Sequence, residues 1–376
     1  MAERTTPAQQ APPHPAPERV HASTSRLAFL DWTRGAAAVI MLQGHVFHSF
    51  LATDLREGSP YILSQFLGGM PPAYFLFLTG VTFAFLLDSL SRRVPSAGQR
   101  FRAALLRARY LFVIAFLFRI QMWLFGLPYS QWVDIFKMDI LNSMGATIAA
   151  LSFLVVFDTR QRVVYAAVCG AVFSGLAPLV THLDWSGAPK LLEAYLKPDP
   201  NTFSLFPWAA FLAFGVSAGS IMRLVPNDLY PRMLEWFALG GLGLILLASY
   251  FSQLPYSVYE RCDFWLDSPG LVLVKTGVVM VTLSLGFLWT TLLSGRTSWV
   301  ALLGQHSLPV YWLHIELVYG RWFGGWKESL STFEVVLCSA ALIVLMIIIS
   351  HYKGRFDKGD YPGLRNWVSA RLSFVS

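Results

Sequence analysis

Four ionisable side chains in the first long apolar segment have the spacing of one helical face. Asp31 and Arg34 are three residues apart, as are His45 and His48, and eleven residues separate Arg34 from His45. Eleven residues make about three turns at about 3.6 residues per turn, so a helix places all four in one stripe. Ionisable groups inside a membrane span are costly and usually functional. A histidine there can move protons near neutral pH, which predicts proton-transfer chemistry.

Each of these residues also has a structural interpretation. Asp31 and Arg34 could form an i,i+3 ion pair near the inner membrane interface. His48 could be a solvated residue at the outer end of the segment. A structural role is hardest to support for His45, which lies deeper in the apolar segment.

The composition is that of a membrane protein. Of 376 residues, 55% are hydrophobic and 14% are charged, whereas a soluble domain has about 25% charged residues. A spanning helix needs about 20 apolar residues. The segments that meet this need are 28–51, 72–90, 104–126, 138–157, 163–181, 203–222, 233–252, 270–293, 299–320 and 332–350.

We therefore predict an all-α fold, a polytopic membrane helix bundle of about ten transmembrane helices. A single membrane domain is expected over 26–350, between a disordered tail at 1–25 and a basic tail at 351–376. Lys and Arg concentrate in alternate connections, which predicts that both termini are cytoplasmic. This bias also accounts for the net charge of +7, so no nucleic-acid partner is needed to explain it.

Polar residues in other spans could converge with His45. Arg119, Asp139 and His314 lie within or at the ends of three further apolar segments. With spans that alternate in direction, all three come to a similar depth, in the outer half. Arg119 could instead simply neutralise Asp139. The three cysteines have no metal-ligand spacing, so no metal is expected.

Several stretches resemble the membrane acyltransferases. Residues 26–45, RLAFLDWTRGAAAVIMLQGH, resemble the opening span of that family with its R-x10-H signature, formed here by Arg34 and His45. Residues 71–87 resemble the second span, and residues 139–149 also fit. FPWAAFLAFGVSAG at 206–219 resembles the heparan-alpha-glucosaminide N-acetyltransferase-like branch, and residues 302–320 resemble a late span that includes Tyr311 and His314.

This resemblance implies transfer of an acyl group, usually acetyl, from acyl-CoA to a hydroxyl or amine of a sugar or glycan acceptor. It places His45 at the catalytic position as base or acyl carrier, Arg34 as its partner and His314 as the late histidine. Asp31 is then expected to orient Arg34. A developing oxyanion could be stabilised by Arg119, His314 or Tyr311.

The expected partners are acyl-CoA, the acceptor and the lipid bilayer, and the oligomeric state stays open. Arg34, Arg119, Arg107 and Arg109 are the candidates for binding CoA, because guanidinium groups bind phosphate. The arginines after the second span could equally reflect membrane topology.

Two other classes of protein compete with an acyltransferase. A transporter or lipid-linked substrate flippase could use the same His, Arg and Asp groups, although we find no internal repeat of the kind common in transporters. A membrane scaffold would need no polar stripe. For the acyltransferase, we expect an integral multi-pass protein of a bacterial inner membrane.

Overall fold

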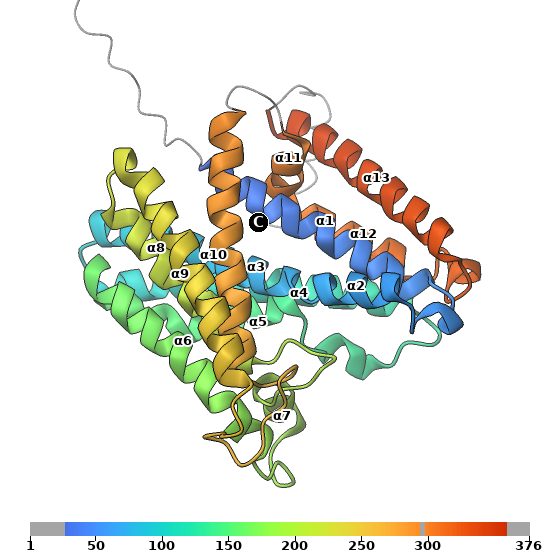
Figure 1. Ribbon diagram of the computed structural model, residues 1–376, viewed down its shortest axis with the longest axis horizontal. Helices are drawn as coiled ribbons and strands as arrows, with labels where there is room; N and C mark the ends of the chain where they lie inside the picture. The colour runs from blue at the N-terminus through green and yellow to red at the C-terminus, as the bar shows by residue number, and fades with distance from the viewer. Residues whose placement is uncertain (1–26, 294–297, 359–376) are drawn as a thin grey trace, which may run out of the picture.

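The computed structural model describes residues 27–293 and 298–358, and Figure 1 shows that helices dominate these ranges. Strand-like pairing in them is limited to one isolated bridge between Leu51 and Leu330. The predicted tail at 1–25 and residues 359–376 of the predicted basic tail lie outside the described residues. Residues 351–358 continue the last helix. The all-helical prediction is confirmed for the described part of the chain.

Every predicted span coincides with helical structure. The long helices are α1 (Ala28–Phe50), α3 (Pro71–Arg93), α4 (Ala97–Phe125), α6 (Thr159–Thr181), α8 (Leu205–Leu224), α9 (Tyr230–Ser252), α10 (Pro269–Leu292) and α13 (Thr332–Lys358). Shorter helices are α2 (Ser59–Gly68), α5 (Ile140–Leu151), α7 (Lys190–Leu196), α11 (Trp299–Gln305) and α12 (Ser307–Tyr319). Two predicted spans are interrupted, because α5 continues as a 3-10 segment, Ser152–Val156, and His306 separates the end of α11 from the start of α12.

Six helical stretches in the described residues are long and apolar enough to cross a membrane. They are Ser59–Arg93, Thr159–Thr181, Leu205–Leu224, Asn227–Ser252, Pro269–Leu292 and Thr332–Lys358. Only 17% of the apolar window in α13 is buried, so most of its apolar surface is left for lipid to cover. A count of ten spans and the placement of the termini remain predictions.

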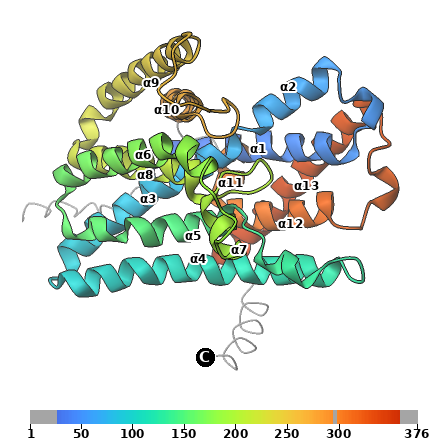
Figure 2. The ribbon, with the colours of Figure 1, turned by 90° about the horizontal axis from the view of Figure 1, so that it is seen from below.

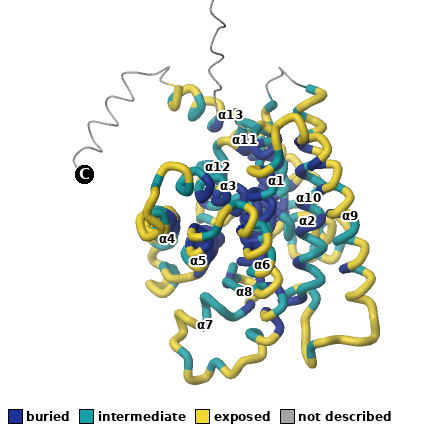
Figure 3. The backbone as a smooth tube through the Cα atoms, turned by 90° about the vertical axis from the view of Figure 1, so that its left-hand side faces the viewer, coloured by how far each residue is buried: buried dark blue, intermediate teal, exposed yellow. Residues whose placement is uncertain are grey.

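The helices surround α1 and α3, which contain many of the buried residues (Figure 3). Figure 2 shows α5 lying between α4 and the pair formed by α6 and α8. Some helices begin at a capping side chain: Asp158 caps α6, Asp139 caps α5 and Ser298 caps α11 through side-chain oxygens. Capping and apolar length together explain why the sequence forms these elements.

Glycine permits the close contact between α3 and α8. A methyl group at Gly80 would lie 2.0 Å from the carbonyl oxygen of Leu212, and one at Gly215 would lie 2.0 Å from that of Phe77. Gly215 and Gly219 have the small-xxx-small spacing that favours close helix packing in membranes. Here that spacing joins two helices of one chain.

Replacing Gly80 by alanine is therefore expected to destabilise the protein by about 1–3 kcal/mol, the range for overpacking. Gly243→Ala on α9 is the matched control, because nothing lies within 4 Å of a methyl group there. We expect the control to be neutral or slightly stabilising, since alanine favours helix. Thermal unfolding of both variants in one detergent tests this, and equal midpoints would contradict the contact.

Two further glycine contacts fix α1 against its neighbours. A methyl group at Gly35 would lie 1.7 Å from the carbonyl oxygen of Val300, and one at Gly304 would lie 1.8 Å from that of Asp31. Near the other end of α1, a methyl group at Gly44 would lie 3.2 Å from the Cα of Gly68 on α2. The helix that carries the predicted stripe is thus held at both ends.

Candidate active site

Two histidines from distant parts of the chain meet inside the bundle. Nδ1 of His45 on α1 lies 2.9 Å from Nε2 of His314 on α12. Their rings are nearly parallel, with an interplanar angle of 10° and centroids 5.1 Å apart. His314 is 0% exposed and His45 is partly buried, so His45 is the more accessible member of the pair.

A backbone carbonyl fixes the protonation of this pair. Nδ1 of His314 lies 2.8 Å from the carbonyl oxygen of Val310, which can only accept, so the neutral ring carries its proton on Nδ1. Nε2 of His314 then has a lone pair and accepts a hydrogen bond from Nδ1–H of His45. The order of these bonds leaves the lone pair of neutral His45 on Nε2, where it can act as a base or nucleophile.

Aromatic side chains surround the histidine pair. The ring of Tyr319 packs edge-on against His45 with centroids 5.3 Å apart, and the Tyr311 ring packs against His314 at 5.8 Å. The hydroxyl of Tyr319 lies 3.2 Å from Nδ1 of His48. His48 is therefore linked to the pair through Tyr319, and it is itself exposed.

The loop between α12 and α13 folds over the end of α1. The backbone N–H groups of Ser329 and Leu330 donate to the carbonyl oxygen of Phe50 at 3.1 and 2.9 Å. Lys327 donates to the hydroxyl of Ser49 at 2.9 Å and to the carbonyl oxygen of Val318. Burial lowers the pKa of Lys327. These bonds join the two segments that carry His45 and His314.

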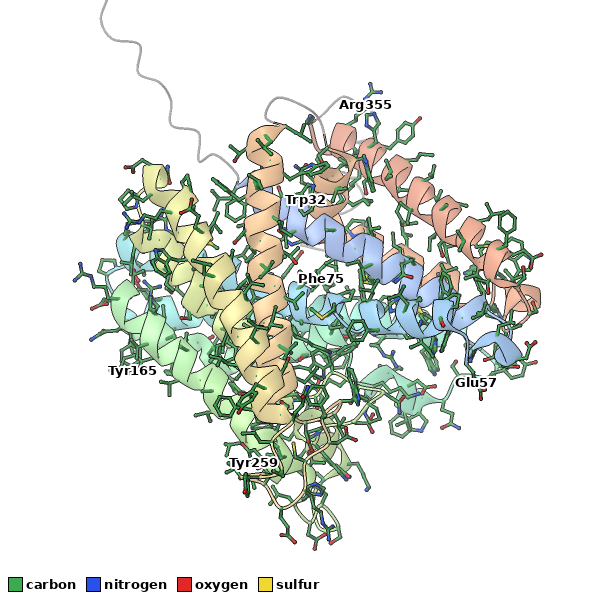
Figure 4. All side chains as sticks on the ribbon, viewed as in Figure 1. Trp32, Glu57, Phe75, Tyr165, Tyr259 and Arg355 are labelled. Atoms are coloured by element: carbon green, nitrogen blue, oxygen red, sulfur yellow. The ribbon has the colours of Figure 1, made fainter. Side chains whose placement is uncertain are left out.

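Asp31 and Arg34 form an ion pair, with Nη1 of Arg34 3.3 Å from Oδ1 of Asp31. They lie near the start of α1, whereas His45 lies near its end, about 16 Å from Arg34 and about 21 Å from Asp31 at about 1.5 Å per residue. Figure 4 labels Trp32 near the start of this helix and Glu57 just beyond its end, well apart. The structure therefore does not bring Asp31 or Arg34 to the histidine pair.

Arg119 and Asp139 are close to Tyr311, but each is held by other groups. Arg119 donates through Nε to the carbonyl oxygen of Asp134 at 2.9 Å, and a second nitrogen donates to the same oxygen. Its hydrogen bonds thus go to the loop before α5 rather than to Asp139. A hydrogen bond from Lys137 holds the pKa of Asp134 below its usual value. Both Arg119 and Asp139 act electrostatically on Tyr311.

A buried polar stripe on α5 extends inward from Asp139. Oδ2 of Asp139, Oγ of Ser143 and Oγ1 of Thr147 are all buried and have no hydrogen-bond partner among the described residues. The three positions are four residues apart and lie on one helical face. Of these three residues only Asp139 was predicted as a candidate from the sequence, although the four-residue spacing of Ser143 and Thr147 after it was a signal for the stripe.

Thr147→Val is expected to raise the free energy of unfolding by about 1 kcal/mol, because it removes an unsatisfied buried hydroxyl and keeps the branched shape. Thr276→Val is the matched control, since the Thr276 hydroxyl is also buried but donates to the carbonyl oxygen of Val272 at 2.8 Å. The control is expected to lose stability. Thermal unfolding of the two variants, measured side by side, tests this prediction. A loss of stability in both would show that the Thr147 hydroxyl has a hydrogen-bond partner.

Arg107 and Arg109 on α4 are exposed and do not meet the histidine pair. The guanidinium of Arg107 lies over the Tyr110 ring at 5.3 Å. Arg109 lies at a pocket of about 510 Å³ whose other lining residues are apolar, Phe112 and Phe116 among them. Such a pocket suits an acyl chain or lipid tail better than a nucleotide.

A cluster of arginines gathers instead around Asp88 at the end of α3. Asp88 is 8% exposed, and its carboxylate contacts Arg92 and Arg223, each at 2.8 Å. The Thr159 hydroxyl donates to it at 3.0 Å, and Arg162 lies 3.9 Å away. From the sequence, Arg92 belongs to a run of arginines that could either bind the phosphates of acyl-CoA or reflect membrane topology, whereas Arg162 and Arg223 were interpreted as topology signals only. Asp88 four residues before Arg92 was the available clue.

The described residues form a helix bundle with six stretches long and apolar enough to cross a membrane, which is the architecture of an integral membrane protein. A family model for heparan-alpha-glucosaminide N-acetyltransferase, catalytic, matches residues 26–253. Since the match covers more than half of the chain, the protein belongs to this family of membrane acyltransferases. The resemblance seen in the sequence is thereby confirmed. No curated protein matches the chain. The matched range includes His45 and ends before α12, which supplies His314.

Proposed function

We propose that the protein transfers an acyl group, acetyl in the simplest case, from acyl-CoA to a hydroxyl or amine of a sugar or glycan acceptor. We place this reaction in a bacterial inner membrane. Membership of the acyltransferase family supports the class of reaction. The observation that carries the proposal is the 2.9 Å contact between His45 and His314, because it leaves Nε2 of His45 available to accept a proton.

In the direct route, Nε2 of His45 takes the proton of the acceptor O–H or N–H while the acceptor attacks the thioester carbonyl. The carbon–sulfur bond then breaks, and the CoA sulfur leaves with the proton returned by His45. His314 holds the His45 ring and stabilises its charged form, as a positioning residue. The hydroxyl of Tyr311 is our candidate donor to the oxyanion, because Arg119 already bonds to a backbone carbonyl.

In the alternative route, Nε2 of neutral His45 attacks the thioester carbonyl, the carbon–sulfur bond breaks, and CoA leaves as its thiolate. The acyl group then passes from Nε2 to the acceptor O–H or N–H, whose proton goes to the thiolate, and neutral His45 is restored. Mass measurement of the intact protein after exposure to acetyl-CoA without acceptor separates the two routes. An added acetyl group on His45 supports the two-step route, and an unmodified protein that still turns over supports the direct one.

The CoA-binding roles of Arg34, Arg107, Arg109 and Arg119 remain proposals. Arg34 lies about 16 Å from His45 along α1, which suits a contact with the distal part of CoA rather than with the thioester. Asp31, paired with Arg34, would orient its guanidinium group.

The first test is acetyl-CoA binding and thioester turnover by the purified full-length protein in detergent, with a panel of sugars and glycans as acceptors. Binding with acceptor-dependent release of CoA is the expected result. A folded protein that binds no acetyl-CoA would refute the proposal. Flux assays in proteoliposomes would then test the transporter alternative.

A further inference from the structure

The cluster around Asp88 holds more positive charge than its carboxylates neutralise. Asp88 is shared by Arg92 and Arg223 at 2.8 Å and by Arg162 at 3.9 Å. Arg100 is near enough to Arg162 for the two guanidinium groups to repel each other. The second acidic group that acts on Arg162 is Asp158. Four guanidinium groups thus share two carboxylates, which leaves about two positive charges.

Arg162 shows this excess most clearly. Its side chain is 1% exposed. Nε donates to the carbonyl oxygen of Asp158 at 3.4 Å and Nη2 to the Thr159 hydroxyl at 2.8 Å, but Nη1 is buried without a partner among the described residues. Nε of Arg100 is also buried and also has no hydrogen-bond partner among the described residues. Buried N–H groups without acceptors are costly, so an added acceptor would stabilise the cluster.

The cluster is also accessible from outside. The side chains of Arg92 and Arg223 are 60% and 34% exposed, so an anion can reach their guanidinium groups. Guanidinium groups bind phosphate oxygens through paired hydrogen bonds. A phosphate group is negatively charged at neutral pH, with about −1.5 to −2 in a phosphomonoester and about −1 in a phosphodiester, so it would offset all or part of the excess. We propose that Arg92, Arg100, Arg162 and Arg223 form a binding site for a phosphate group.

The phosphate could come from a soluble nucleotide, as at the distal end of CoA, or from an anionic phospholipid beside the ends of α3 and α8. The site lies far from the loop that follows α1, since Figure 4 places Tyr165, one turn beyond Arg162 on α6, at the opposite edge of the molecule from Glu57. The proposal concerns the phosphate group alone and does not depend on acyl transfer.

The test uses full-length protein in nanodiscs. Adenosine 3′,5′-bisphosphate is titrated into nanodiscs of phosphatidylcholine, and retention of phosphatidylglycerol is measured by native mass spectrometry. The variants are Arg162→Gln and Arg223→Gln. Arg223 is more exposed than Arg162, so its variant still tests the proposal if Arg162→Gln does not fold. Arg93→Gln is the matched control, because Arg93 is exposed next to the cluster.

We expect at least about a tenfold loss of binding in Arg223→Gln and Arg162→Gln, the scale of a charged hydrogen bond, and no loss in Arg93→Gln. A loss in nucleotide binding identifies a soluble ligand, and a loss in phosphatidylglycerol retention identifies a lipid. The proposal is overturned if neither ligand binds, or if the cluster variants and the control bind equally. The cluster would then serve only to join helices.

Discussion

Replacing His45 by alanine is expected to lower kcat for acyl transfer by about 10²- to 10⁴-fold, the usual contribution of a general base. Binding of acetyl-CoA should change little, because the ring acts on the reacting atoms rather than on the nucleotide. His182→Ala is the matched control, an exposed histidine at the end of α6. Steady-state kinetics on the three proteins tests this. Undiminished turnover in His45→Ala would exclude both proposed routes.

The loss of kcat on replacing His314 should depend on whether the new side chain can accept a hydrogen bond, which would not be so for a residue that only packs. His314→Leu removes the acceptor for Nδ1–H of His45, and we expect a fall of about 10²-fold in kcat with little change in KM. His314→Gln restores an acceptor oxygen and should recover part of the loss. Equal activity in the leucine and glutamine variants would show that packing alone matters at this position.

Asp88→Asn is expected to lower the free energy of unfolding by about 3–5 kcal/mol, the cost of breaking a buried ion pair from one side. The neutral amide leaves the guanidinium of Arg162, whose side chain is 1% exposed, without its nearest carboxylate. Contacts among α3, α6 and α8 should loosen together, since the residues of this cluster lie on all three. The shift in unfolding midpoint in one detergent measures the effect.

Glu193→Gln provides the control for this prediction. Glu193 also contacts two basic groups, Lys190 and Lys197, both at 3.1 Å. It lies at the surface, where solvent screens such pairs, so we expect little change in the midpoint. If Asp88→Asn changed the unfolding midpoint as little as Glu193→Gln, the arginines around Asp88 would be solvated, and the buried cluster would be refuted.

Local rules were sufficient to predict most of the fold. Apolar length located the long helices because every backbone group in a membrane needs an internal partner, which a helix provides. The short helices α2 and α7 lie outside the predicted spans. The breaks at His306 and after Leu151 were not predicted, since apolar composition continues across both. Such breaks depend on how neighbouring helices pack, and the apolar pattern of one segment does not show which helices will pack against it.

The candidate site was predictable to the extent that its residues lie on one helix. Eleven-residue spacing picked out His45, and the late-span pattern picked out His314, but their direct contact depends on how α1 crosses α12. Asp31 and Arg34 share the helix of His45 and are still about three turns from it. The Asp88 cluster was missed because Arg162 and Arg223 are far apart in sequence and look like ordinary flanking charges.

The carbonyl oxygen of Val310 has a consequence for mutational scanning. It sets the tautomer of the whole histidine pair, yet it belongs to the main chain and is the same whatever side chain residue 310 carries. Because the Val310 side chain is fully buried, an alanine scan would report its packing and not the role of its carbonyl oxygen. An amide-to-ester replacement of the linkage that follows Val310 weakens the carbonyl as an acceptor, and so reaches an element of the site that no side-chain library can sample.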